Sequence, residues 1–138
     1  LLRQGWQLPP PLTGVSWLTW LNDQTPIEQL PVLPQVHAGQ NESLLLVKVD
    51  PENKALLALR LWPSSYQLEP DDLRLWVGNI SMLRPVTQSG VSAPRTQPDF
   101  DLPLQRLLAT PLPLQQRHVR RKGVQEGWSG EVLLIYAR

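Results

Sequence analysis

The chain has 138 residues, a formal net charge of +1, 41% hydrophobic residues and 18% charged residues, which is typical of a globular protein and not of a disordered one. With so small a net charge, no whole-molecule field favours binding to nucleic acid or to an anionic membrane. Because cysteine is absent and only two histidines are present, disulfides, thiolate zinc sites, a cysteine nucleophile and multi-histidine metal sites are excluded.

The first forty residues predict short helical segments that prolines interrupt. A helix is expected over 16–23, where apolar residues recur near helical spacing. One further turn is expected after Thr25-Pro26, because a capping residue is followed there by a first-turn proline. Pro31 and Pro34 end this helical region, and a short strand is expected over 33–37.

The middle of the chain predicts a β-hairpin. Two apolar runs at 43–50 and 54–62 are separated by Pro51-Glu52-Asn53, and a turn of this composition between two such runs is a hairpin signal. A third apolar run at 73–83 predicts another strand of the same sheet.

The remaining segments predict two loops, a helix and a second hairpin. Residues 63–72 and 84–98 are rich in proline and polar residues, and a loop as long as the second is usually functional or mobile. Residues 99–110 predict a helix with a leucine-rich side, whose acidic start suits the helix dipole. A hairpin is expected from strands 114–122 and 131–138.

This order of elements favours an α+β fold, with a mainly antiparallel sheet of about five strands and two or three short helices packed on one face. We expect one soluble domain over residues 1–138. Because the chain begins without methionine, we interpret it as an excised C-terminal module of a longer protein. No apolar run approaches the roughly 18 residues that a membrane-spanning helix needs.

The sequence Arg-Leu-Trp occurs twice, at 60–62 and at 74–76. Strand alternation predicts an aliphatic sheet face and an opposite face that carries both Arg–Trp pairs, with Arg60 close to Arg74. Such pairs can hold planar or anionic ligands, so the candidate ligand-binding residues include Arg60, Trp62, Arg74 and Trp76. The alternative, which we favour, is that the indoles cover the sheet and the pairs are structural.

Two acidic residues, Asp99 and Asp101, precede or begin the late helix, and Gln97 lies just before them. General acid–base chemistry or metal binding through these carboxylates would need support from histidine or further acids, and the neighbouring sequence supplies none. Helix capping and compensation of the helix dipole are therefore the favoured interpretation. We predict no catalytic residue, no metal and no cofactor, and keep Gln97, Asp99 and Asp101 as candidate ligand-binding residues.

The one dense charge run lies at residues 117–122. Its basic residues are candidates for contact with an anionic surface such as lipid phosphates: Arg117, Arg120, Arg121 and Lys122. No aromatic residue is interleaved with them, and charges on an edge strand also serve to block unwanted pairing. We favour this edge-strand interpretation and expect no nucleic-acid partner.

Five segments together resemble the C-terminal domain of LssY-like bacterial proteins, over about residues 1–110. They are Leu2-x-x-x-Gly5-Trp6, Leu30-Pro31-x-Leu33-Pro34, Leu59-Arg60-Leu61-Trp62, Leu75-Trp76-Val77-Gly78 and Pro98-Asp99-Phe100-Asp101. In that family the last segment is preceded by Thr-His and followed by Glu-Arg. Here Gln97 follows Thr96, and Pro103-Leu104 stand in place of Glu-Arg, so much of any polar site in this segment is lost.

In that family the domain is found attached to integral membrane parts, including DedA-like and type-2 phosphatidic acid phosphatase-like regions. The resemblance implies an accessory or interaction module without catalysis of its own. It implies a soluble domain that is membrane-associated through the rest of its protein, on the cytoplasmic side, and linked to lipid-phosphate metabolism. The expected partner is an upstream transmembrane domain of the same polypeptide or another membrane protein, with weak contact to anionic lipid headgroups.

Two alternatives stay open. The first is a small-ligand-binding or hydrolytic domain that uses the Arg–Trp face with Asp99 and Asp101. The second is a nucleic-acid-binding domain that uses the basic C-terminal hairpin.

Overall fold

The chain folds into antiparallel sheets with one α-helix in the part that the structure describes. The computed structural model describes residues 1–13, 16–22, 24–70, 72–111, 115–122 and 126–136. Its strands are β1 (Val36–His37), β2 (Gln40–Asn41), β3 (Leu44–Asp50), β4 (Ala55–Leu68), β5 (Leu73–Gln88), β6 (Val91–Thr96), β7 (Gln115–Arg120) and β8 (Glu131–Tyr136). The α-helix is α1 (Asp101–Leu108), and three short 3-10 helices precede the strands: η1 (Leu2–Gln4), η2 (Ser16–Leu21) and η3 (Ile27–Gln29).

The expected α+β fold with two or three helices on one face is therefore wrong: the molecule is mainly β. The segments expected as early helices form only the 3-10 turns η2 and η3. Helical segments of this length are marginal without extensive packing, and the prolines at 26, 31 and 34 prevent their extension. The strands are also longer than expected, because β4 and β5 continue through residues that the composition assigns to loops.

Four strands form the central sheet in the order β3-β4-β5-β6. The predicted hairpin is confirmed, since β3 pairs with β4 from Leu44↔Leu61 to Asp50↔Ala55. The two smaller sheets are hairpins, β1–β2 and β7–β8, and the second confirms the predicted C-terminal hairpin within the described residues. All neighbouring strands are antiparallel.

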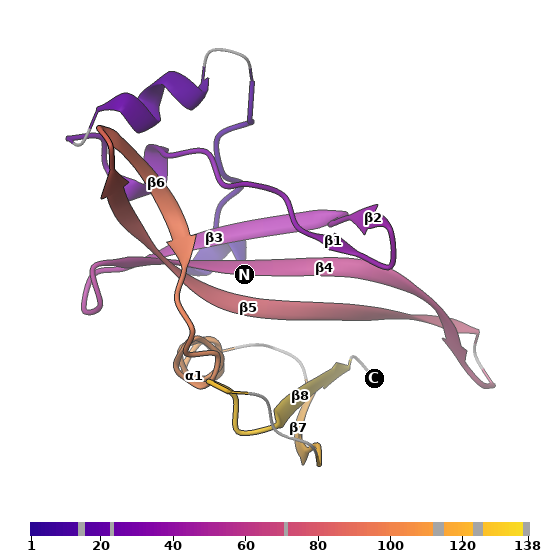
Figure 1. Cartoon of the computed structure of the whole chain (residues 1–138). Helices are drawn as coiled ribbons and strands as arrows, with labels where there is room; N and C mark the ends of the chain where they lie inside the picture. Colours follow the sequence, from indigo (N-terminus) through magenta and orange to yellow (C-terminus); the bar gives the residue numbers. More distant parts are fainter. Residues whose placement is uncertain (14–15, 23, 71, 112–114, 123–125, 137–138) are drawn as a thin grey trace.

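Each face of the central sheet is covered by a different part of the chain (Figure 1). The helix face carries Leu57, Leu59, Ile80 and Met82, which pack with Leu104 and Leu107 of α1 and with Trp6. The opposite, N-terminal face carries Leu56, Ala58 and Leu83, which pack with Val32 and Ile27 from the segment that contains η3. The sheet therefore lies between two layers and has an apolar core on each side.

The segment 84–98, expected to be irregular, contains the last five residues of β5 and the whole of β6. Pro85 and Pro94 face each other in this ribbon, whereas pairing of β5 with β4 ends at Leu83. The nitrogen of Pro85 therefore lies at an edge where no strand requires an N–H donor, the position at which a strand tolerates proline. Proline content alone did not reveal this arrangement.

The opposite end of β5 pairs with β4 beyond the end of β3, as Figure 1 shows. We call this two-stranded extension the arm; it consists of residues 63–68 of β4, the connection 69–72 and residues 73–77 of β5. The register shifts between Pro63 and Gln67, an irregularity that bends a strand and strengthens its twist.

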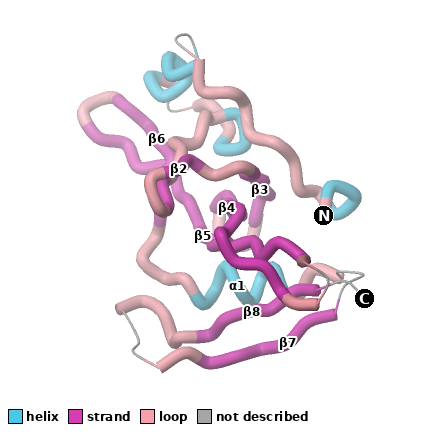
Figure 2. The backbone as a smooth tube through the Cα atoms, turned by 90° about the vertical axis from the view of Figure 1, so that its right-hand side faces the viewer, coloured by secondary structure: helices cyan, strands magenta, loops and turns pink. Residues whose placement is uncertain are grey.

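The C-terminal hairpin packs below α1. In Figure 2 the helix lies between the central sheet and the β7–β8 hairpin. Leu133 of β8 packs against the core of the helix face, and the backbone N–H of Phe100 donates to the carbonyl of Gly127 at 2.9 Å.

Candidate functional site

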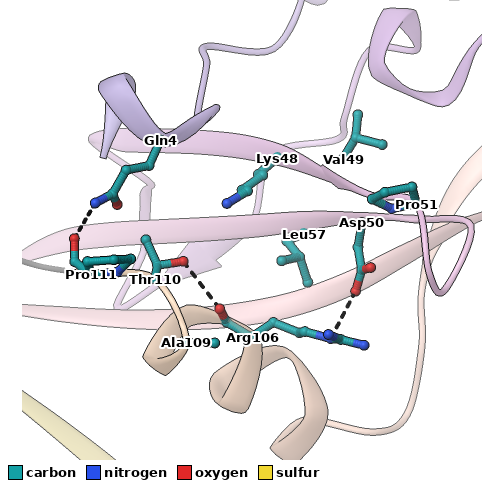
Figure 3. A pocket seen from close by; sticks show the side chains of 10 residues that line it. All are labelled: Gln4, Lys48, Val49, Asp50, Pro51, Leu57, Arg106, Ala109, Thr110 and Pro111. Carbon is teal, nitrogen blue, oxygen red and sulfur yellow. Dashed lines mark hydrogen bonds and ion pairs between the residues drawn. The ribbon is translucent and has the colours of Figure 1, made fainter.

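A pocket of about 270 Å³ opens beside the first strand of the central sheet (Figure 3). It is lined by residues from η1, β3, β4, the end of α1 and the residues that follow it: Gln4, Lys48, Val49, Asp50, Pro51, Leu57, Arg106, Ala109, Thr110 and Pro111. Figure 3 shows Gln4, Thr110 and Pro111 at one end and Asp50 with Arg106 at the other, with the amine of Lys48 turned toward the Gln4 end.

Each end of this pocket holds a buried polar atom without a hydrogen bond among the described residues, Arg106 Nε at one end and Gln4 Oε1 at the other. Arg106 forms ion pairs with the buried Asp50, at 3.3 Å, and with Glu52, and Asp50 also accepts a hydrogen bond from the side chain of Asn53 at 2.8 Å. At the other end the Gln4 amide donates to the carbonyl of Pro111. The Gln4 Oε1 atom, however, is buried and accepts no hydrogen bond from the described residues.

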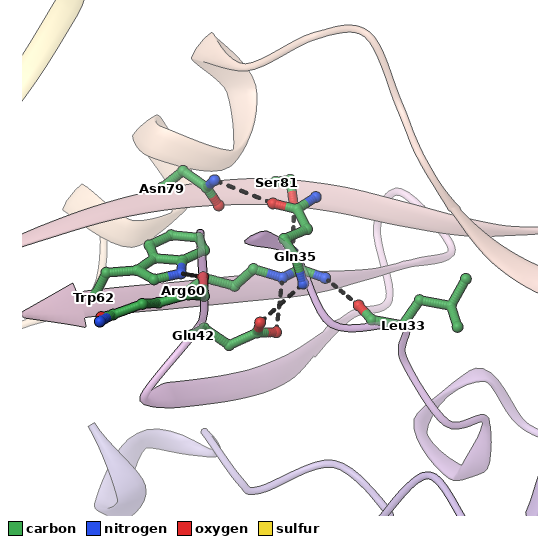
Figure 4. A network of polar contacts seen from close by, with 8 residues as sticks. Leu33, Gln35, Glu42, Arg60, Trp62, Asn79 and Ser81 are labelled. Carbon is green, nitrogen blue, oxygen red and sulfur yellow. Dashed lines mark hydrogen bonds and ion pairs between the residues drawn. The ribbon is translucent and has the colours of Figure 1, made fainter. Parts of the chain in front are cut away.

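A second polar cluster is centred on Arg60, on the N-terminal face (Figure 4). Arg60 is 1% exposed. Its guanidinium donates to Glu42 Oε1 at 3.3 Å, to Ser81 Oγ at 3.2 Å and to the carbonyl of Leu33 at 3.2 Å. The second carboxylate oxygen of Glu42 accepts the backbone N–H of Gln35 at 2.8 Å.

This cluster is closed to ligands. Burial lowers the pKa of Arg60, and the nearby Glu42 carboxylate opposes that shift. Because all three branches of the guanidinium already have acceptors and water does not reach it, the side chain ties the segment 33–42 to the sheet. These contacts support the interpretation that Arg60 stabilises the fold and does not bind a ligand.

Trp62 belongs to the same buried cluster. The residue is 4% exposed, and its indole N–H donates to the carbonyl of Gln40 at 3.1 Å. The His37 ring lies over it with a centroid distance of 5.6 Å and an interplanar angle of 53°. The indole thus holds the β1–β2 hairpin against the sheet.

The expectation that both Arg–Trp pairs share one face is wrong. In the β4–β5 register Arg60 faces Asn79 and Trp62 faces Val77, whereas Trp76 faces Pro63. Because successive residues of a strand point to opposite faces, Arg74 and Trp76 lie on the face opposite to Arg60 and Trp62. Arg74 is also five strand positions from Asn79, roughly 17 Å along the sheet, so Arg60 and Arg74 are not neighbours.

Arg74 and Trp76 lie instead in the exposed arm. Trp76 is 52% exposed, and it is one of several large apolar side chains that the arm presents to solvent: Tyr66, Leu68, Leu73, Leu75, Trp76 and Val77. Exposed apolar side chains that gather in this way mark interaction surfaces in soluble proteins.

The arm also has an unpaired strand edge. Within the described residues, β6 pairs with β5 only from Leu83 onward, and the one further backbone bond on this edge runs from Gln97 N–H to the carbonyl of Met82. By alternation, the backbone groups of Arg74, Trp76 and Gly78 point to the same edge as Met82. Such an edge can accept an added strand.

Asp99 and Asp101 both serve the local structure. Asp99 Oδ1 accepts the backbone N–H groups of Asp101 at 3.0 Å and of Leu102 at 3.1 Å, which is the geometry of a helix cap. The Asp101 carboxylate accepts the backbone N–H of Ser129 at 2.9 Å and its hydroxyl at 2.8 Å. Asp101 therefore fastens the C-terminal hairpin to the start of α1.

Gln97 lies beside this region and donates its side-chain amide to the carbonyl of Arg95 at 3.2 Å. No hydrogen bond or ion pair of the described residues joins Gln97, Asp99 or Asp101 to either Arg–Trp pair. Across the same residues, no group of three or more histidine and acidic side chains is arranged to hold a metal ion.

The basic candidates lie on the C-terminal hairpin. Arg117 and Arg120 belong to β7, and Arg121 and Lys122 follow it; all four are exposed. Arg117 lies opposite Leu134 and Arg120 opposite Glu131. Alternation therefore divides the two strand arginines between the two faces of the hairpin.

The family described as LssY C-terminus matches residues 1–130. The chain belongs to this family. No curated protein and no solved structure shows significant similarity to it. In the part of the chain that the structure describes, no helix has the length and apolar character needed to cross a membrane.

The segments that carry the resemblance to the LssY C-terminal family are largely structural. Trp6, Leu30, Arg60 and Trp62 are each at most 4% exposed. Gly78 is required by packing, because a Cβ atom there would lie 2.8 Å from the carbonyl oxygen of Arg60. Among the exposed members of these motifs, Leu75, Trp76 and Val77 belong to the arm.

The residues that line the pocket, above all Gln4, Lys48 and Arg106, were not predicted from the sequence. One signal was present: Lys48 is the one charged residue within the apolar run 44–49. A charged side chain inside a strand of this kind indicates either an exposed edge or a polar site. The partner of Arg60, Glu42, was missed as well, because it lies in a segment expected to be a polar turn.

Proposed function

We propose that this chain is an interaction module of a bacterial membrane-associated protein linked to lipid-phosphate metabolism, without catalysis of its own, and that the arm is its docking element. Membership of the LssY C-terminal family supports the setting. The observation that carries the docking role is the arm itself, which joins exposed apolar side chains to an unpaired strand edge.

The partner is a protein segment in extended conformation that adds to the free edge of β5. Backbone hydrogen bonds to this edge provide affinity, and the side chains of Leu75, Trp76 and Val77 provide specificity. The connection at the end of the arm carries Glu69 and Asp72, which are exposed. Because anionic headgroups repel such a tip, the arm suits a protein partner better than direct insertion into an anionic bilayer.

The hydrolytic alternative has no support from the geometry. It requires the Arg–Trp residues to converge with Asp99 and Asp101, but Arg60 and Trp62 are buried on one face and Asp101 binds Ser129 near α1 on the other.

Site-specific photocrosslinking in the full-length protein tests the docking role. A photoreactive amino acid replaces Trp76 in the arm, and a matched control replaces Val36, which is 67% exposed on β1. We expect the arm position to crosslink, in bacterial membranes, to an integral membrane protein or to the membrane part of the same polypeptide. Identical adducts at both positions, or recovery of the protein outside the membrane fraction, would contradict the proposal.

A further inference from the structure

We propose that the pocket lined by Gln4, Lys48 and Thr110 binds a small anion that also carries a hydroxyl group, such as a hydroxy carboxylate or a phosphate ester of a polyol. The inference is independent of the arm and goes beyond the proposed docking function. It rests on a lysine ammonium that has no ion pair with the described residues and a buried carbonyl oxygen that has no donor, both in the lining of one pocket.

The first of these groups is the Lys48 ammonium. Lys48 is partly buried, and no described acidic residue lies within ion-pair distance of it. Asp50, two residues further along the same strand, is instead engaged by Arg106 and Asn53. Arg106 is neutralised by Asp50 and Glu52, so Lys48 is the charged group of the lining that has no ion pair with the described residues, and an anion is the ligand that this ammonium favours.

The second group is the carbonyl oxygen of the Gln4 side chain. The amide nitrogen of Gln4 is held by the carbonyl of Pro111, so rotation of the amide would bring two oxygens together and is unfavourable. The Oε1 atom is thereby fixed as a buried acceptor without a donor. Burial of such an atom costs free energy unless a donor reaches it, and a hydroxyl group of the ligand is a donor of the required kind.

The remaining lining limits the size of the ligand. Leu57, Val49, Pro51 and Pro111 provide apolar walls. The volume of about 270 Å³ lies just below the usual range for small-molecule sites, which is about 300–1,000 Å³. A group of the size of glycerol phosphate matches both the volume and the two polar contacts, and its source is either a free metabolite or the headgroup of a lipid.

Titration of the full chain with glycerol 3-phosphate, followed by two-dimensional amide NMR, tests the site. The side-chain amide of Gln4 is a local reporter, since it gives its own signals. We expect saturable shifts of the Gln4 side chain and of the backbone amides of Lys48 and Thr110. Inorganic phosphate should bind more weakly, because its P–OH groups belong to the anion held at Lys48 and it has no separate hydroxyl group to reach Gln4, and glycerol should not bind.

Two variants separate the site from general charge. Lys48→Met retains the apolar part of the side chain and should weaken binding about tenfold, the loss expected for one charge-assisted contact. Lys54→Met removes an exposed lysine from the neighbouring turn and should leave binding unchanged. Gln4→Leu should abolish the preference for glycerol 3-phosphate over inorganic phosphate. The amide spectrum of each variant shows that it is folded.

A soluble short-chain phosphatidylglycerol, used below its micelle concentration, distinguishes the two sources. Binding of this lipid that depends on Lys48 assigns the pocket to a headgroup, and binding of glycerol 3-phosphate alone assigns it to a free metabolite. Absence of shifts at Gln4 with every probe, or equal affinity of the wild type and Lys48→Met, would overturn the proposal.

Discussion

The guanidinium of Arg60 and the carboxylate of Glu42 lie 3.3 Å apart, and the two side chains are only 2% and 5% exposed. The pair joins the middle of β4 to the chain just before β3, and its further bonds reach Leu33 and Ser81. One buried ion pair thus connects the irregular N-terminal segment to two strands of the central sheet.

Removal of one partner of this pair should be strongly destabilising. We expect Glu42→Gln to lower the free energy of unfolding by about 3–5 kcal/mol, because it leaves the buried guanidinium without a counter-charge. Burial lowers the pKa of Arg60, because an environment that excludes water disfavours the charged form. Urea denaturation followed by circular dichroism measures the loss.

A double variant provides the control. Arg60→Met combined with Glu42→Leu removes both charges, and the combined loss should be smaller than that of Glu42→Gln alone. Glu69→Gln, at the exposed end of the arm, should change stability by less than about 0.5 kcal/mol. A loss of similar size for Glu69→Gln and Glu42→Gln would show that the buried pair has no special role.

The two Arg-Leu-Trp segments should respond differently to truncation of the indole. Trp62 is 4% exposed and Trp76 is 52% exposed. We expect Trp62→Ala to cost about 3–5 kcal/mol, and Trp76→Ala about 1 kcal/mol or less. The denaturation midpoints of the two variants, compared with the wild type, measure this difference. Equal midpoints would show that the arm is packed against the rest of the molecule.

The repeated Arg-Leu-Trp segments show why alternation alone could not place both pairs. The connection 69–72 has an even number of residues, so an even-numbered residue of one strand lies opposite an odd-numbered residue of the other, as in the pair Leu68↔Leu73. Residues 60 and 74 are both even-numbered and therefore lie on opposite faces of the sheet. With one residue more or less in the connection, the two residues would lie on the same face. Both segments were predicted as strands, although shorter than β4 and β5 are. Alternation describes one strand at a time, and which faces of two strands coincide depends on their register.

The β3–β4 hairpin was predictable, because apolar runs separated by turn residues report directly on strand pairing. For the β7–β8 hairpin the signal was the glycine-bearing stretch 123–130 between the two expected strands. The β5–β6 ribbon was not predictable, because its prolines lower the strand propensity of 84–98 without excluding an edge position. The pocket was also beyond prediction: Gln4, Lys48 and Thr110 come from three separate elements, and only the tertiary packing brings them together.

The contact between Asp101 and Ser129 should hold the C-terminal hairpin in place. We expect Asp101→Ala to destabilise this contact by about 1–3 kcal/mol and to increase amide hydrogen exchange across β7 and β8. Asp99→Ala should cost about 1 kcal/mol as a lost cap and affect exchange in the first turn of α1 instead. Unchanged protection of β8 in Asp101→Ala would show that the packing of Leu133 alone is sufficient.

The basic residues of the C-terminal hairpin should give only weak, salt-sensitive attraction to anionic surfaces. Arg117 and Arg120 point to different faces of β7, and Arg120 lies opposite Glu131, so no face presents the whole charge. Each basic residue held near an anionic bilayer contributes about 1 kcal/mol, and this attraction falls off within a Debye length. Such an attraction is useful to a domain that another segment already holds at a membrane.

We therefore expect sedimentation with anionic liposomes to be marginal at low salt and to vanish near 0.15 M ionic strength, and to be lost when Arg120→Glu and Arg121→Glu are combined. Tight sedimentation with neutral liposomes, or binding that the double substitution does not alter, would contradict an electrostatic role for this hairpin.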